Sequence, residues 1–308
     1  MVRPNFLARW GWWPDFLLLS AIWGGSFLFM RIAVVEFGPV PTAMLRAGIG
    51  ALALLPLLFW RGLAGALVPH WKPAFLAGIL NASIPSATAS YALLFLTTGT
   101  VSVINATVPL FGALLAWLWL HQRPSRLAAV GLVCGFVGVA ALAWGKAGFH
   151  GGADGYASLL AVLAVATGAA SGAFSALFAR RYLLGVPPLV IASGSQIGAT
   201  LALAVPALVL WPSTMPGAGA WLAAAGAGVI CTGLGYVLFF RLVAKAGPNR
   251  ALTVTFLMPL FAMVYGFLLL DESITAGMLG CAALIIGGTA LSTGVFSRRR
   301  VQPPRPSE

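Results

Sequence analysis

The segment VPLFGALLAWLWLHQRPS at residues 108–125 recurs at residues 258–275 as MPLFAMVYGFLLLDESIT. Both copies begin with an apolar run that contains a proline and end in a short polar segment. Further matches at nearly the same spacing join Gly25-Ser26-Phe27 and Pro41 to Gly172-Ala173-Phe174 and Pro188, and Gly131 and Gly138 to Gly280 and Gly287. The chain therefore contains two related halves.

The composition places most of the chain in a lipid bilayer. Of the 308 residues, 60% are hydrophobic and 8% are charged, with a mean hydropathy of +0.96. An ordinary soluble domain is about half apolar and about a quarter charged, so a soluble protein is excluded. Because a helix needs about 20 apolar residues to cross the hydrocarbon, we predict ten transmembrane helices. Their approximate ranges are 13–34, 40–60, 73–95, 98–120, 126–145, 156–179, 187–210, 219–240, 249–270 and 274–295.

Each half contains five of these helices, and an odd number reverses the direction of the second half. The predicted fold class is therefore an all-α integral membrane protein with ten transmembrane helices in two inverted five-helix repeats. Such repeats are typical of secondary transporters, whose substrate site lies near the midplane between the halves. The predicted parts are a cytoplasmic N-terminus (1–12), a first repeat (13–145), an outer linker (146–155), a second repeat (156–295) and a basic cytoplasmic tail (296–308).

The basic residues predict the orientation. With the N-terminus in the cytoplasm, only Lys146 of the 18 Lys and Arg residues falls in an outer loop, while Arg31 and Arg46 lie inside apolar stretches. The inner side holds Arg3, Arg9, Arg61, Lys72, Arg123, Arg126, Arg180, Arg181, Arg241, Lys245, Arg250, Arg298, Arg299, Arg300 and Arg305. This bias predicts a multi-pass protein of the cell inner (plasma) membrane with both termini in the cytoplasm.

The same distribution explains the net charge of +12 without a nucleic-acid partner, because the basic residues form no patch interleaved with aromatic side chains. Cys134, Cys231 and Cys281 lie in apolar stretches without metal-ligand or disulfide spacing. We expect no cofactor, no metal and no catalytic residue. The expected partners are a small-molecule substrate and the lipid bilayer; the oligomeric state stays open, and a monomer is compatible with the sequence.

Several motifs resemble the EamA group of the drug/metabolite transporter superfamily over roughly residues 15–295. The opening pattern is Trp23-Gly24-Gly25-Ser26-Phe27, followed by Pro39 and Arg46, and the two proline-containing segments quoted above are similar to the paired signature of that family. The resemblance implies a ten-helix transporter, and many members export amino acids, other metabolites or drugs. The family usually has a glutamate after the 98–120 helix, where this chain has Gln122; Glu272 keeps the equivalent position of the second half.

Three prolines predict a cavity near the midplane. Proline inside a helix leaves the carbonyl four residues earlier without its usual donor. For Pro85, Pro109 and Pro259 these carbonyls belong to Asn81, Asn105 and Thr255, which also carry polar side chains. Irregular backbone is tolerated at this depth where it is buried in protein or faces a watery cavity. We expect the polar residues to bind substrate and the prolines to act as hinges or gates; the alternative is a structural kink.

The remaining site candidates rest on helix periodicity and residue type. In the 73–95 helix, a rotation of about 100° per residue places Asn81, Pro85, Thr88 and Tyr91 on a predicted cavity face and Ser83, Ala87 and Ser90 on a packing face. Aromatic and small polar side chains elsewhere could flank the cavity or stack on a substrate. These are Trp23, Ser26, Phe27, Phe174, Ser175, Tyr236 and Tyr265, for each of which packing or lipid contact is the alternative.

Arg46 is the one charged residue well inside a predicted span. It could contact a substrate carboxylate, or it could be structural and bind helix carbonyls or Glu36. No Asp or Glu lies mid-span, so we expect facilitated transport or exchange, without proton coupling.

The sequence therefore predicts a facilitator or exporter of small neutral or zwitterionic metabolites, with amino acids, aromatic ones included, as the first choice. A drug or other-metabolite exporter is the alternative. An integral-membrane lipid-modifying enzyme would need a clustered set of catalytic groups, which His70, His121 and His150 in separate loops do not supply.

Overall fold

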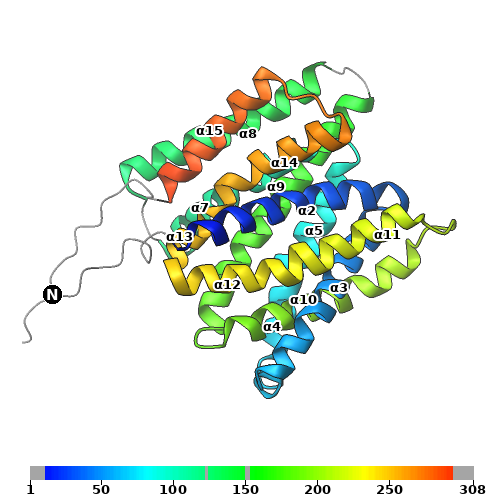
Figure 1. Cartoon of the computed structure of the whole chain (residues 1–308). Coiled ribbons are helices and arrows are strands. Elements are labelled where there is room, and N and C mark those ends of the chain that lie inside the picture. The colour runs from blue at the N-terminus through cyan, green and yellow to red at the C-terminus, as the bar shows by residue number, and fades with distance from the viewer. Residues whose placement is uncertain (1–10, 122–123, 150–152, 294–308) are drawn as a thin grey trace, which may run out of the picture.

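The computed structural model describes residues 11–121, 124–149 and 153–293. In these residues every regular element is a helix, and ten helical segments correspond to the ten predicted spans (Figure 1). In chain order they are α2 (Trp13–Phe37), α3 (Pro39–Trp60), α4–η2–α5 (Trp71–Gly78, Ile79–Ser83, Ile84–Leu93), α6 and α7 (Thr98–Asn105, Val108–Leu120), α8 (Arg126–Phe149), α9 (Ala153–Tyr182), α10 (Pro188–Val209), α11–η3–α12 (Ala218–Ala225, Gly226–Leu234, Gly235–Ala246), α13 and α14 (Pro248–Leu252, Val254–Leu270) and α15 (Ala276–Ser292).

The helices form one bundle of membrane-spanning length. Eight of the described helices are long and apolar enough to cross a bilayer, and α15 is a shorter apolar helix. The tenth segment, α4–η2–α5, carries several polar residues. The prediction of an all-α integral membrane protein is thereby confirmed. Gln122, most of the predicted N-terminus, the basic tail and part of the linker lie outside the described residues.

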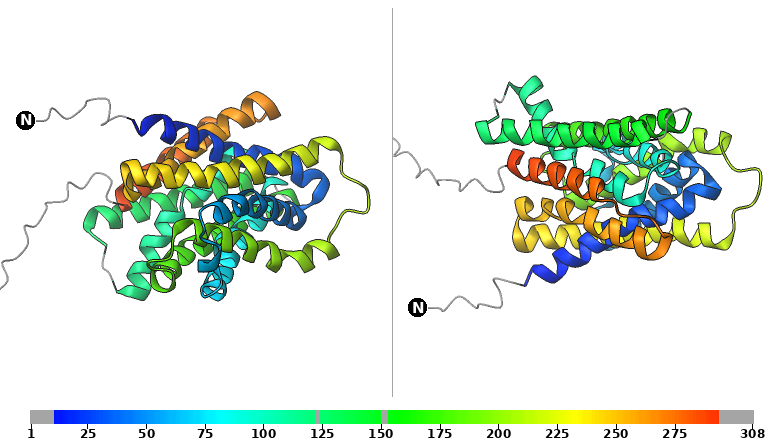
Figure 2. Two further views of the ribbon diagram at one scale, coloured as in Figure 1. Left: turned by 60° about the horizontal axis from the view of Figure 1, so that its bottom comes forward. Right: turned by 90° about the horizontal axis from the view of Figure 1, so that it is seen from above.

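The views agree on how the chain enters and leaves the bundle. The blue start of α2 and the red end of α15 lie on the same side (Figure 1). The loop between α10 and α11 extends beyond the opposite end (Figure 2). This is the arrangement that an even number of spans produces.

The internal repeat is visible in the backbone. His121 and Asp271 end α7 and α14, the helices of the two quoted segments, and are the only described non-glycine residues with positive φ, each at 52°. Gly38 and Gly185, which precede the second helix of each half, have φ values of 78° and 83°. The π-helical segments η2 and η3 interrupt the third helix of each half, beginning at Ile79 and Gly226. The two halves therefore repeat their turns and helix distortions as well as their sequence.

Glycines allow two of the closest helix contacts. A Cβ atom on Gly131 in α8 would lie 2.5 Å from the carbonyl oxygen of Gly288 in α15, and one on Gly288 would lie 2.5 Å from that of Gly131. A Cβ atom on Gly24 in α2 would lie 2.8 Å from the carbonyl oxygen of Met258 in α14. Such small-residue contacts let helix backbones approach closely in membranes.

Two predicted helices are interrupted, in addition to containing a proline. The 98–120 span is divided at Ala106 and Thr107, so Pro109 lies in the first turn of α7. The 249–270 span is divided at Thr253, and Pro259 lies inside α14. Threonine hydroxyls bind carbonyls beside both interruptions: Thr107 donates to Ile104 at 2.6 Å, and Thr253 donates to Arg250 at 2.7 Å.

Candidate functional site

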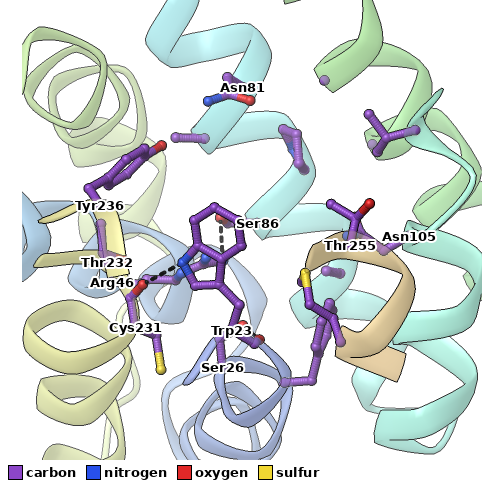
Figure 3. A pocket seen from close by; sticks show the side chains of 18 of the residues that line it. Trp23, Ser26, Arg46, Asn81, Ser86, Asn105, Cys231, Thr232, Tyr236 and Thr255 are labelled. Atoms are coloured by element: carbon purple, nitrogen blue, oxygen red, sulfur yellow. Dashed lines mark hydrogen bonds between the residues drawn. The ribbon is translucent and has the colours of Figure 1, made fainter. Parts of the chain in front are cut away.

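A cavity of about 230 Å³ lies in the centre of the bundle (Figure 3). It is lined by residues of both halves, and most of them belong to the middle parts of their helices. Polar side chains from α3, η2, α5, α6, α10, η3, α12 and α14 face apolar and small residues there. The arrangement is that of a polar site buried between two repeats, as expected of a substrate site near the midplane.

The structure brings nine of the candidate residues together around this cavity. Eight of them are Trp23, Ser26, Arg46, Asn81, Pro85, Asn105, Tyr236 and Thr255. Asn105 and Thr255, which are equivalent in the internal repeat, lie near each other at one side in Figure 3, and Asn81 and Tyr236 lie at the other. Phe27 also lines the cavity. The binding roles of these side chains stay predictions.

Four candidates from the 73–95 and 156–179 spans do not line the cavity. Thr88 donates to the carbonyl of Ile84 at 2.8 Å and lies against Gly168 of α9, so it packs between helices. Tyr91 packs on Phe95 with a ring separation of 5.2 Å. Phe174 stacks on Trp119 with ring centroids 5.0 Å apart, and Ser175 is buried and donates to the carbonyl of Ala77 at 3.4 Å.

Tyr265, Pro109 and Pro259 also lie outside the lining. Tyr265 packs beside Phe261 on α14, with ring centroids 6.1 Å apart, and contacts α2 at Gly25. Pro109 and Pro259 adjoin Val108 and Met258, which do line the cavity. Both prolines therefore lie directly behind residues of the cavity wall. Their predicted role as hinges does not require that they line the cavity.

The π-helical segment η2 explains why half of the residues that were predicted to face the cavity from the 73–95 helix do not line it. The lining residues there are Asn81, Ala82, Pro85, Ser86 and Ala89. The prediction assumed a rotation of about 100° per residue, whereas a π-helical turn has wider i→i+5 bonding and turns less per residue. The residues after η2 are rotated accordingly, so that Ser86 faces the cavity and Thr88 turns away from it.

Three polar lining residues were not among the candidates. Gln196 on α10 is the only amide of that helix, and the cost of a polar group in hydrocarbon was the signal that could have identified it. Gln196 lines the cavity together with Asn81 and Tyr236. Ser86 and Thr232 carried no comparable signal, because serine and threonine are common in packed membrane helices.

Trp23 links the two halves across the cavity. Its indole Nε1–H donates to the carbonyl of Cys231 in η3 at 3.1 Å (Figure 3). A Cβ atom on Gly235 would lie 2.5 Å from Trp23 Nε1, so only a glycine there leaves room for the indole. Thr232 donates to the carbonyl of Ala227 at 3.0 Å, as the wider turn of η3 permits. The indole of one repeat thus binds the distorted backbone of the other.

Arg46 does not bind Glu36, the structural partner considered for it. Its Nη1 group donates to Ser86 Oγ at 3.1 Å and contacts Met30 Sδ at 3.3 Å. The Glu36 carboxylate instead accepts from the backbone N–H of Gly217 at 2.5 Å, at the start of α11. The guanidinium group therefore lies deeper than the reach of Glu36 and faces the cavity.

The two ends of the cavity differ. On the side where α2 ends, Ala262 of α14 has no exposed surface and packs against Gly24. Its equivalent in the internal repeat is Gly112 of α7, one helical turn beyond the lining residue Val108. A Cβ atom on Gly112 would meet nothing within 4 Å. Ala262 is therefore packed against α2, whereas Gly112 has no neighbouring atom in the direction of a side chain.

Comparisons with known proteins agree with this architecture. The family model described as "EamA-like transporter family" matches residues 12–144 and again residues 159–294. A protein of known crystal structure superposes with a TM-score of 0.66 at 20% sequence identity, covering 94% of this chain and 99% of that chain, and so shares the fold.

Curated relatives are of similar length. The chain is 24% identical to "Uncharacterized transporter YoaV" of Bacillus subtilis (strain 168) over 92% of this chain and 97% of the relative. It is 24% identical to "Uncharacterized transporter YvbV" of the same organism, over 89% of this chain and 88% of the relative. An "Uncharacterized transporter" of Archaeoglobus fulgidus is 21% identical over 90% of this chain and 96% of the relative. Because the family model matches both halves, the chain belongs to the EamA-like transporter family.

Proposed function

We propose that the central cavity binds a small neutral or zwitterionic metabolite and that the protein carries it across the inner (plasma) membrane by alternating access. Amino acids, aromatic ones included, are the proposed substrates. The observation that carries the proposal is the lining of one cavity by amide and hydroxyl groups from both inverted repeats. A scaffold protein has no need of such a polar site at the midplane.

The lining chemistry supports an amino-acid substrate. Asn81, Asn105 and Gln196 each offer an amide oxygen to an ammonium group and an amide N–H to an oxygen. Trp23, Phe27 and Met258 offer apolar surface to a side chain. Small-molecule sites commonly combine an apolar wall with a few placed polar groups in this way.

The proposed orientation places both termini in the cytoplasm, because the basic residues follow the positive-inside rule. Ala262 then lies toward the outer side and Gly112 toward the cytoplasmic side. Alternating access would expose the cavity to each side in turn. Pro109 and Pro259, next to the lining residues Val108 and Met258, are the proposed hinges for the opposite gates.

Facilitated transport or exchange is the proposed mode. The described lining residues include Arg46 but no Asp, Glu or His side chain that could relay a proton. A substrate gradient would therefore provide the driving force.

Counterflow in proteoliposomes tests the proposal. Vesicles loaded with a mixture of unlabelled amino acids are assayed for uptake of single labelled ones, with and without a pH gradient. Saturable uptake that needs no pH gradient is expected. Uptake of drugs or other metabolites in place of every amino acid would support the alternative exporter, and uptake that collapses with the proton gradient would contradict the uncoupled mode.

A pair of glycine variants tests whether the cavity is the path. Gly172→Leu adds a side chain to the lining where a Cβ atom would meet only Val108, at 4.0 Å, so the helix can accept it while the cavity is filled. Gly287→Leu is the matched control, because a Cβ atom there meets nothing within 4 Å and the residue does not line the cavity. Counterflow should be abolished in Gly172→Leu and kept in Gly287→Leu; equal flux in both would contradict the assignment.

A further inference from the structure

Arg46 is the one charged side chain among the described residues that line the cavity. Its Nη1 group donates to the neutral oxygen of Ser86 at 3.1 Å (Figure 3) and contacts the thioether sulfur of Met30 at 3.3 Å. A guanidinium group has five N–H donors, and a hydroxyl and a thioether are weak acceptors for it. The hydrogen-bonding capacity of Arg46 is therefore largely unused.

No described carboxylate neutralises this charge. The two ion pairs among the described residues both involve Asp15, which binds Arg241 at 3.1 Å and Lys245 at 2.7 Å. Glu36 and Glu272 accept hydrogen bonds from the backbone starts of α11 and α6. An unpaired cation inside a membrane bundle costs free energy, so it persists where a cavity or a ligand supplies the missing interactions.

We infer that Arg46 binds a single carboxylate group of the transported molecule and that this group defines the substrate class as small monocarboxylates, amino acids among them. This inference rests on the proposed transport function and adds the group that the site recognises. Arginine suits a carboxylate because its planar donors match the two oxygens. The second half has Ser193 at the position equivalent to Arg46 when Gly38 is aligned with Gly185, so the cavity offers one such cation and fits one carboxylate.

The groups around Arg46 are consistent with a carboxylate that carries a neighbouring amine or hydroxyl. Tyr236, Asn81 and Gln196 line the same cavity as Arg46 and offer it a hydroxyl group and two amide groups. These neutral amides can accept from an ammonium group without pairing with Arg46. A carboxylate on Arg46 would thus lie beside acceptors for the rest of an amino-acid head group.

Matched probes separate the carboxylate from the rest of the molecule. The first set is L-leucine, L-leucinamide and 4-methylpentanoate, and the second is L-phenylalanine, L-phenylalaninamide and 3-phenylpropanoate. L-Leucinamide and L-phenylalaninamide lack the carboxylate, and 4-methylpentanoate and 3-phenylpropanoate lack the ammonium group. Binding is measured as the rise in melting temperature of the purified protein, and transport as counterflow of the same compounds.

Three variants complete the design. Arg46→Gln removes the charge, and Arg46→Lys keeps it with a different donor geometry. Arg31→Gln is the control, because Arg31 is also an arginine within a helix that spans the bundle but does not line the cavity. Size-exclusion profiles and melting temperatures without probe identify any variant that does not fold.

The wild type and Arg31→Gln should be stabilised by the carboxylate probes and not by the amides. Arg46→Gln should weaken carboxylate binding by roughly tenfold to a hundredfold, the range of a lost hydrogen bond to a charged group, while Arg46→Lys keeps part of it. Equal binding of carboxylates and amides by the wild type, no binding of any carboxylate probe, or an unchanged preference in Arg46→Gln would overturn the inference.

The two readouts separate this inference from the proposed function. Carboxylate binding that depends on Arg46 without any counterflow would sink the transport proposal and leave the site standing. Counterflow of amino acids that is unchanged in Arg46→Gln would support the transport proposal and overturn the assignment of Arg46 as the carboxylate site.

Discussion

The carboxylate of Glu272 accepts hydrogen bonds from both donors of Thr98, the backbone N–H and the side-chain hydroxyl. The backbone N–H of Thr98 donates to the two carboxylate oxygens at 2.9 and 3.1 Å, and its hydroxyl donates at 2.6 Å. The contact joins the residue after α14 to the start of α6, where an anion is favoured by the free N–H groups of a helix N-terminus. Gly266 leaves room for it, since a side chain there would overlap both Glu272 and Thr98.

The equivalent positions at the other end of the bundle carry different residues. At the equivalent positions of the internal repeat, Gln122 replaces Glu272, Ala116 replaces Gly266, and Pro248 replaces Thr98. Proline has no backbone N–H to donate. The contact can therefore form at one end of the bundle only, the end where α6 begins and α14 ends.

We predict that Glu272→Gln loosens the contact between α14 and α6 and so exposes Ala262. The variant loses charge-assisted hydrogen bonds that contribute about 1–3 kcal/mol to this contact. Ala262→Cys, in a background with the native cysteines replaced by alanine, reports the exposure through labelling by a membrane-impermeant maleimide. Labelling should rise in Glu272→Gln and stay low in Asp271→Asn, the neighbouring control; equal labelling in both would show that Glu272 does not hold this contact.

The difference between Ala262 and Gly112 gives a second prediction. Cysteine at position 112 faces open space, whereas cysteine at position 262 replaces a side chain with no exposed surface. In the same cysteine-free background, Gly112→Cys should be labelled much faster than Ala262→Cys by a maleimide that reaches both sides. Addition of a transported amino acid should raise the labelling of Ala262→Cys if alternating access exposes that residue; similar rates without substrate would contradict the burial of Ala262 against α2.

Trp23→Phe is predicted to lower stability and flux together. The change keeps an aromatic ring but removes the Nε1–H that donates to the Cys231 carbonyl, which costs about 1 kcal/mol for a buried acceptor left unpaired. The melting temperature and the counterflow rate should both fall. Trp60→Phe is the control because Trp60 is 81% exposed at the end of α3, and it should change neither quantity.

Gly131→Ala is predicted to separate α8 from α15. The added Cβ atom would lie 2.5 Å from the Gly288 carbonyl oxygen, a backbone atom that cannot move aside like a flexible side chain. Overpacking of this kind costs about 1–3 kcal/mol, so the melting temperature should fall. Gly287→Ala, whose Cβ atom meets nothing within 4 Å, should leave it unchanged; an equal fall would show that the glycine contact is not close in the membrane.

The proline argument shows what could be predicted of the site. Pro85, Pro109 and Pro259 pointed to Asn81, Asn105 and Thr255, and all three of these side chains do line the cavity. The argument succeeded because a missing backbone donor is a property of the chain itself. It failed one turn later on the same helix: Thr88 packs against α9 and Ser86 lines the cavity, because the π-helical turn of η2 changes the rotation between residues.

Arg46 shows the limit of sequence reasoning about partners. Its depth within a span could be read from the distance to the nearest helix end, but its contacts could not. Glu36 is close to Arg46 in sequence and binds Gly217, while Ser86 belongs to another helix and binds Arg46. Hydrogen bonds of this kind depend on which helices become neighbours.

The membrane location, the ten helices and the inverted repeat could be predicted from the chain alone, because hydropathy, span length and an odd number of helices per half need no contacts. The folded arrangement of the helices was needed to show which polar side chains meet in the cavity and what Arg46 contacts. Those features arise from helix distortions and from long-range packing between the halves. Small helix rotations and single glycines there decide which of several equally polar side chains face the cavity.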